Sequence, residues 1–167
     1  MAVSSATRAR LETQGFVGLP DEALAEVQPW MRFSPALCAV ITGLATVFAA
    51  PAVLWALVPL AALGAVLPFH PFDLIYNYGL RRLTRTRPLP PNGPPRRFAC
   101  GVAAVWLTAT ALAFGAGART LGYVLGGVLT ALMVLVATTH ICVASMIYGA
   151  LFRRAGHPER PPRPTAA

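Results

Sequence analysis

Histidine and cysteine are the residues of this chain whose side chains most often do chemistry, and they occur close together in the stretch ATTHICVASM. His140 and Cys142 lie two residues apart within a long apolar run. An ionisable side chain inside a membrane-spanning segment is costly and therefore points to a function, and imidazole and thiolate both ligate metals. The pair suggests a metal or redox site, or a proton relay. The alternative is one buried imidazole that hydrogen-bonds to a neighbouring helix.

Spacing argues against a shared metal ion. Two residues that are two positions apart on a regular helix point to nearly opposite sides, so His140 and Cys142 cannot chelate one ion from such a helix. Measured from the nearest flanking arginine, Cys38, Cys100 and Cys142 lie about 9, 5 and 17 Å into their apolar runs. No zinc-type spacing is present. We therefore expect no cofactor, and His140 and Cys142 are the only metal candidates.

The stretch HPFDLIYNYGLRRLTRTR, residues 70–87, is the second place where polar chemistry interrupts the apolar chain. A helix over 71–85 places Asp73, Asn77 and Arg81 on one side as i,i+4 neighbours, with apolar residues that include Tyr76 on the other. This pattern predicts a short amphipathic helix lying along the inner membrane surface.

The arginines in and after this helix are candidates for contact with anionic lipid headgroups, each contributing about 1 kcal/mol. The alternative is a docking surface for a partner protein or an anionic ligand. The arginines concerned are Arg81, Arg82, Arg85, Arg87, Arg96 and Arg97.

Gly122 and Gly126 form a GxxxG spacing near the start of the last apolar run. Small residues at this spacing let two helices approach closely in lipid. We expect them to serve helix packing within the chain rather than a homodimer.

The elements that must position these residues are apolar helices. The chain is 56% hydrophobic and only 12% charged, whereas a typical soluble domain is about 25% charged. Four spans are expected, at about 33–50, 51–68, 98–116 and 121–148. The first two run on without a polar break, and one helix over both would be about 54 Å long, against a bilayer core of about 30 Å. We expect a hairpin that turns near Ala49–Pro51, with a partly inserted hairpin as the alternative.

The fold class that follows is all-α, a four-span transmembrane bundle with the interfacial helix in its central loop. Residues 1–32 form a cytoplasmic arm, within which PDEALAEVQPW could make a short helix. Residues 33–152 form the membrane domain, and the proline-rich tail 153–167 is expected to be disordered.

Arginine placement predicts the orientation. Thirteen of the fourteen arginines lie in the arm, the central loop or the tail, and only Arg119 lies on the other side. The positive-inside rule then puts both termini and the central loop in the cytoplasm. We expect a multi-pass protein of a bacterial inner membrane.

Several function classes are disfavoured. The arginines flank apolar runs instead of lining one soluble face, so we expect no nucleic-acid partner. All six acidic residues lie outside the spans, which argues against an ion-coupled transporter. No phosphate-cradling loop or nucleophile motif is present. The favoured hypothesis is a non-enzymatic accessory or interaction protein of a membrane complex. The alternatives are a redox or metal-handling protein that uses His140 and Cys142, and a small transporter or channel component.

The arrangement HPFDLIYNYGLRRLTRTRPLPPNGPPRRFACG, followed by HICVASMIYG in a glycine-rich last run, resembles an uncharacterised group of small bacterial four-helix membrane proteins that carry a domain of unknown function. The resemblance covers roughly residues 30–152. Members of that group often show Cys-x-x-Cys near the end of the last span. The matching place here reads Cys142-Val143-Ala144-Ser145, which argues against a dithiol redox role. Since the group has no assigned activity, the resemblance implies architecture only.

Overall fold

The computed structural model describes residues 3–152, and this range is helical with no strand. The elements in chain order are α1 (Ser5–Thr13), α2 (Asp21–Val27), η1 (Trp30–Arg32), α3 (Phe33–Val47), α4 (Pro51–Val66), α5 (Pro71–Ile75), the π-turn η2 (Tyr76–Leu80), α6 (Arg81–Thr84), α7 (Pro94–Gly115), α8 (Arg119–Thr139) and α9 (Val143–Phe152). The short helix expected in the arm is α2. The tail that was expected to be disordered, 153–167, lies outside the described residues.

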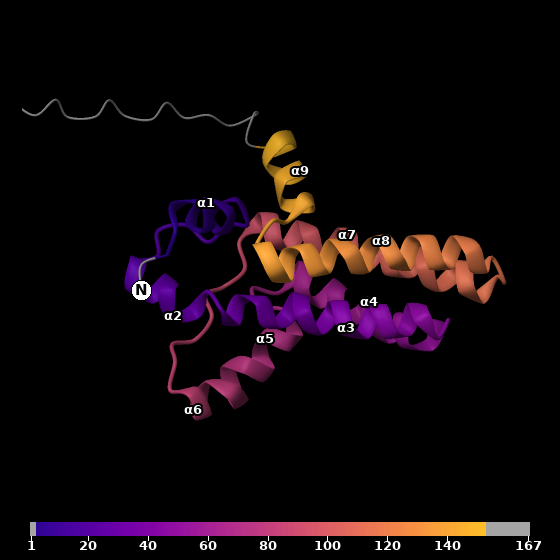
Figure 1. The fold of residues 1–167 in the computed structure, drawn as a ribbon, viewed down its shortest axis with the longest axis horizontal. Coiled ribbons are helices and arrows are strands. Elements are labelled where there is room, and N and C mark those ends of the chain that lie inside the picture. Colours follow the sequence, from indigo (N-terminus) through magenta and orange to yellow (C-terminus); the bar gives the residue numbers. More distant parts are fainter. Residues whose placement is uncertain (1–2, 153–167) are drawn as a thin grey trace, which may run out of the picture.

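The long helices α3, α4, α7 and α8 run side by side as a bundle (Figure 1). Helix α4 packs along α7, and α3 packs along α8. The α3–α4 and α7–α8 turns lie together at one end of the bundle, which we call the turn end. The N-terminal helices, α5, α6 and α9 gather at the opposite end, which we call the arm end (Figure 1).

The hairpin predicted near Ala49–Pro51 is present. Helix α3 ends at Val47, and Ala49 adopts a left-handed conformation with φ of 46°. The amide of Ala50 donates to the carbonyl of Ala45 at 2.8 Å, which satisfies an otherwise unpaired helix-end carbonyl. Pro51 then occupies the first turn of α4, where its missing N–H costs nothing.

In the described part of the chain, three helical segments are long and apolar enough to cross a membrane: Trp30–Val47, Pro94–Gly115 and Arg119–Thr139. A fourth candidate is the bent pair Pro51–Val66 and Pro71–Thr84, whose two parts meet at 83°. Large apolar side chains cover the outside of the bundle, and Val105 on α7 is 72% exposed. These apolar helices are compatible with a membrane protein.

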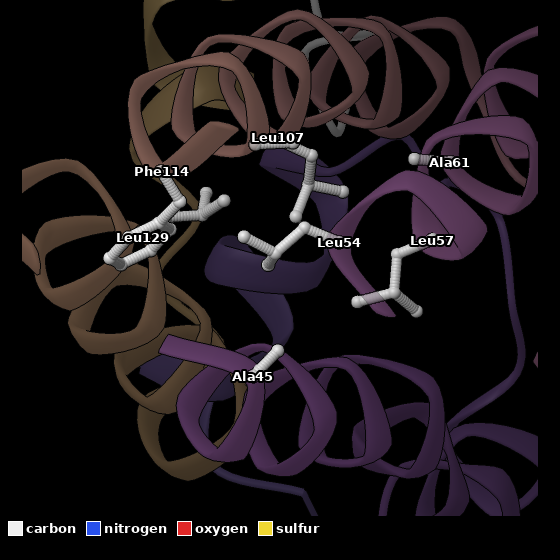
Figure 2. Packing of buried hydrophobic residues seen from close by; sticks show 8 residues of the cluster. Ala45, Leu54, Leu57, Ala61, Leu107, Phe114 and Leu129 are labelled. Carbon is white, nitrogen blue, oxygen red and sulfur yellow. The ribbon is translucent and has the colours of Figure 1, made fainter. Parts of the chain in front are cut away.

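The core lies where the four long helices meet. Figure 2 shows the side chains of Leu54, Leu107 and Leu129 pointing into the space between the helices. Two glycines bring α8 close to its neighbours. A Cβ on Gly126 would lie 2.2 Å from Oγ1 of Thr46 on α3, and one on Gly122 would lie 2.7 Å from the Phe114 ring on α7.

The last apolar run differs from the prediction of one helix over 121–148. Helix α8 ends at Thr139, His140 is left-handed with φ of 58°, and α9 begins at Val143. Helix α9 then leaves the bundle at a steep angle (Figure 1). The break occurs because side chains from α1 and the residue after it bind the end of α8. Arg10 donates to the carbonyl of Thr139 at 3.0 Å, and Gln14 donates to that of His140 at 2.7 Å.

The amphipathic helix predicted over 71–85 is present as α5, η2 and α6, but its faces differ from those expected. Asp73 is only 3% exposed, Tyr76 is fully buried, and Leu83 is 83% exposed. Asp73 points inward because it is the third residue of α5 and its carboxylate bonds back to the helix start. Beyond it, the π-turn inserts an extra residue into one turn, which rotates the following residues away from the simple 3.6-residue pattern.

Candidate functional site

A cavity of about 220 Å³ lies between α3, α4, α7 and α8, and residues at the arm end form part of its wall. Much of its wall is apolar, with Leu107 and Leu129 among the deep residues. Its polar and thiol-bearing lining residues are Gln14, Ser34, Cys38, Thr42, His70, Arg96, Cys100 and Cys142. The cavity is therefore the place where most of the chemistry-bearing side chains of the bundle meet.

All three cysteines line this one cavity, although their positions in the sequence suggested different depths. The depth assigned to Cys142 was wrong because it assumed a continuous last helix, and this residue lies in the break between α8 and α9. A signal was present for Cys38: Ser34, Cys38 and Thr42 recur every four residues along one face of α3. Within residues 3–152, no group of three or more histidine, cysteine or acidic side chains is arranged to hold a metal ion.

His70 is a site residue that the sequence argument did not single out. It lies at the bend between α4 and α5 and is only 6% exposed. Its Nδ1 accepts from the amide of Phe72 at 3.2 Å and lies 3.1 Å from the hydroxyl of Ser34. Gly64 makes room for it, since a Cβ there would lie 2.6 Å from the imidazole and 3.2 Å from Sγ of Cys100. The available signal was the spacing His70-Pro71-x-Asp73, which is that of a capped helix start.

Asp73 also stabilises the bend between α4 and α5 by hydrogen bonds. Its Oδ2 accepts from the amide of His70 at 3.1 Å and from the side chain of Asn92 at 3.5 Å. The amide of Asn92 also donates to the carbonyl of Pro68 at 2.6 Å. The polar side expected for Asp73 with Asn77 and Arg81 is thus divided: Asp73 belongs to the buried bend.

His140 does not lie in the middle of a span, as a continuous helix would have required. It lies at the arm end, where its Nε2 accepts from Nε of Arg32 at 2.9 Å and lies 3.2 Å from Nε2 of Gln28. Burial, together with the charges of Arg32, Arg96 and Arg10, lowers the pKa of His140 from its usual 6.5 to about 4. The neutral imidazole therefore ties the arm to the end of α8, and its bonded Nε2 is not free to join Cys142 in a metal site.

Lowering the pH should destabilise the contact between the arm and the end of α8. An unfolded histidine binds a proton below about pH 6.5, whereas folded His140 does so only below about pH 4. Between these values the unfolded state binds more protons, so the free energy of unfolding falls as the pH is lowered, by up to about 1.4 kcal/mol per pH unit. The measurement is the unfolding midpoint in mild detergent at pH 7.5 and at pH 5.

His140→Asn is the matched control, because asparagine tolerates the left-handed backbone and its carbonyl can still accept from Arg32. The variant should lose less stability than the wild type over this pH range. Equal losses in the two proteins would show that His140 does not titrate in this way.

The structure divides the six candidate arginines into two groups. Arg87 pairs with Glu26 at 3.3 Å, and Arg97 donates to the carbonyls of Ala65 and Val66 at the end of α4. Arg96 lines the cavity. The remaining three lie on α6 or at its end and form no ion pair within residues 3–152: Arg81, Arg82 and Arg85.

The fold is all-helical, and its long apolar helices are compatible with a membrane protein. At one end of the bundle, polar and thiol-bearing side chains line part of a cavity. Residues 28–153 match the family model described as a domain of unknown function, DUF4395, and the chain belongs to this family. No curated protein and no solved structure matches it.

Proposed function

We propose that this chain is a non-enzymatic accessory protein of a membrane complex in the bacterial cytoplasmic membrane, and that α5, η2 and α6 together form its contact surface for a partner membrane protein. We call this continuous segment, residues 71–84, the interfacial helix. Both termini and the interfacial helix lie on the cytoplasmic side in this proposal. The excess of arginine at the arm end supports that orientation.

The observation that carries the proposal is the direction of the interfacial helix. It meets α4 at 83°, so if α4 crosses the membrane, the interfacial helix lies along the membrane surface. Figure 1 shows it projecting away from the bundle at the arm end.

Its exposed side chains fit a contact at that surface. Tyr78 is 70% exposed and Leu83 is 83% exposed. Arg81 and Arg82 lie on the same segment and Arg85 directly follows it, and none of the three forms an ion pair within residues 3–152. Exposed aromatic and arginine residues are enriched at the centres of protein interfaces. Anionic lipid would satisfy the arginines as well, so the experiment must separate a protein partner from headgroups.

A photo-crosslinking residue in place of Tyr78 tests the proposal in living cells. We expect one adduct of discrete mass with another membrane protein, reduced several-fold when Arg81, Arg82 and Arg85 are all changed to Gln. The same probe in place of Val105, which is 72% exposed on the side of the bundle, is the control and should label lipid. Adducts with lipid alone at both positions would overturn the proposed protein contact and leave only a lipid anchor.

A further inference from the structure

We propose that the cavity at the arm end is a binding site for a small amphiphilic anion. The ligand class is a medium-chain carboxylate of about eight carbons that carries a second hydrogen-bonding group at its far end. This proposal is independent of the partner contact above, since it concerns the interior of the bundle.

Arg96 supplies the site for the negative head. It lines the cavity and is only partly exposed, yet it forms no ion pair within residues 3–152. Its neighbours are weak partners: the carbonyl of Met31 at 3.5 Å and the ring of Phe16 at 5.3 Å from the guanidinium carbon. The buried carboxylate of this region, Asp73, bonds through Oδ2 to His70 and Asn92. Its Oδ1 has no partner within residues 3–152, and it forms no ion pair with Arg96 there. An arginine that lines an apolar cavity without a carboxylate partner favours an anion there.

Thr42 supplies an independent signal deeper in the cavity. It is fully buried, it lines the cavity, and its hydroxyl has no hydrogen-bond partner among the described residues. The other threonines that bond within the long helices donate to the carbonyl four residues earlier: Thr46, Thr108, Thr110, Thr130, Thr138 and Thr139. Threonine in a helix has two accessible χ1 rotamers, so this hydroxyl is available to a ligand. An unsatisfied buried hydroxyl is costly, and a ligand group that bonds to it removes the cost.

The distance between these two groups sets the length of the ligand. Arg96 is the third residue of α7 and Thr42 is the tenth of α3, and both helices begin at the arm end. Thr42 therefore lies about 10 Å deeper along the bundle. An extended chain of about eight carbons covers a comparable length, with Cys38, Cys100 and Leu107 lining its path.

The volume agrees with a ligand of this size. An engineered cavity of about 150 Å³ accommodates benzene, and this one, at about 220 Å³, accommodates a molecule about half as large again. A whole phospholipid is too large, so a lipid would insert only the end of one acyl chain, which offers nothing to Thr42. The far polar group thus distinguishes a free carboxylate from a lipid chain.

The test is equilibrium binding of radiolabelled octanoate and 8-hydroxyoctanoate to the full-length protein in phosphatidylcholine nanodiscs. We expect saturable binding of one molecule per chain, about five-fold tighter for 8-hydroxyoctanoate because one hydrogen bond is added. Arg96→Gln should weaken both ligands by about tenfold or more. Octylamine, with the opposite head charge, should not compete.

Thr42→Val is the matched variant, because it keeps the shape of the side chain and removes only the hydroxyl. It should erase the difference between the two ligands while leaving octanoate affinity unchanged, and the empty protein should be no less stable than the wild type. A separate series in phosphatidylglycerol nanodiscs tests lipid as the source of the anion, since a lipid occupant would abolish octanoate binding there. Loss of octanoate binding in phosphatidylglycerol nanodiscs would overturn the proposal. So would equal affinity of the wild type for the two carboxylates, or the absence of saturable binding. If Arg96→Gln fails to fold, the Thr42→Val comparison still decides it.

Discussion

Replacing Gly126 with alanine will destabilise the bundle, whereas the same change at the neighbouring Gly127 will not. A Cβ at Gly126 would lie 2.2 Å from Oγ1, 2.6 Å from Cγ2 and 3.0 Å from Cβ of Thr46. Thr46 is itself buried, and its hydroxyl is bonded to the carbonyl of Thr42 at 2.8 Å, so it cannot turn aside freely. Overpacking of this kind typically costs about 1–3 kcal/mol.

Gly127 is the control because a Cβ there meets no atom within 4 Å. Replacing a helical glycine by alanine is intrinsically favourable by about 1 kcal/mol, and this gain applies at both positions. The unfolding midpoint in mild detergent should therefore fall for Gly126→Ala and stay level or rise for Gly127→Ala. Adding Thr46→Ala to Gly126→Ala removes the clashing atoms and should restore most of the loss. Equal shifts for the two glycine variants would mean that α3 and α8 are not in close contact.

Local sequence chemistry was sufficient to predict the hairpin. The turn at Ala49–Pro51 follows from the length of the apolar run and from a proline that suits a helix start but not a helix interior. The glycine spacing likewise pointed to close helix contacts, and the geometry around Gly122 and Gly126 agrees with it.

The break at His140 could not be read locally. No proline or glycine marks it, and a left-handed histidine is uncommon. The signal that ends α8 comes from α1 and the residue after it, since Gln14 and Arg10 supply donors for its last carbonyls from 126 and 129 residues away. The same long-range contact moved Cys142 from a spanning helix to the cavity wall. The periodicity of a single sequence carries no information about contacts between distant segments, so it could not predict this break.

The interfacial helix shows the same limit. The 3.6-residue period placed Tyr76 on a membrane-facing side, but the arm covers it: its ring lies 5.0 Å from that of Trp30. Leu11, Leu24 and Val27, all from α1 and α2, belong to the same buried cluster. Neither α1 nor the π-turn was evident from composition, and together they decide which residues of this helix are buried.

Tyr76→Ala will detach the interfacial helix from the arm. Tyr76 has no exposed surface, and truncating a buried aromatic side chain to alanine typically costs about 3–5 kcal/mol. Its hydroxyl lies 2.5 Å from that of Thr86, so Tyr76→Phe isolates the hydrogen bond and should cost only about 1 kcal/mol. Tyr78→Ala is the matched control, because that ring is 70% exposed and lies two residues away on the same helix.

Trypsin provides the measurement, since a protease needs a locally unfolded segment and Arg81, Arg82 and Arg85 offer cleavage sites. Cleavage at these sites should be at least about tenfold faster in Tyr76→Ala than in Tyr78→Ala, with Tyr76→Phe in between. If the proposed orientation is correct, the effect occurs in inside-out vesicles and is absent from right-side-out ones. Equal rates for the two alanine variants would show that Tyr76 does not hold the helix. Fast cleavage confined to right-side-out vesicles would show that the interfacial helix lies on the opposite side of the membrane from the one proposed. The packing of Tyr76 against the arm would still be supported, because that contact does not depend on the side of the membrane.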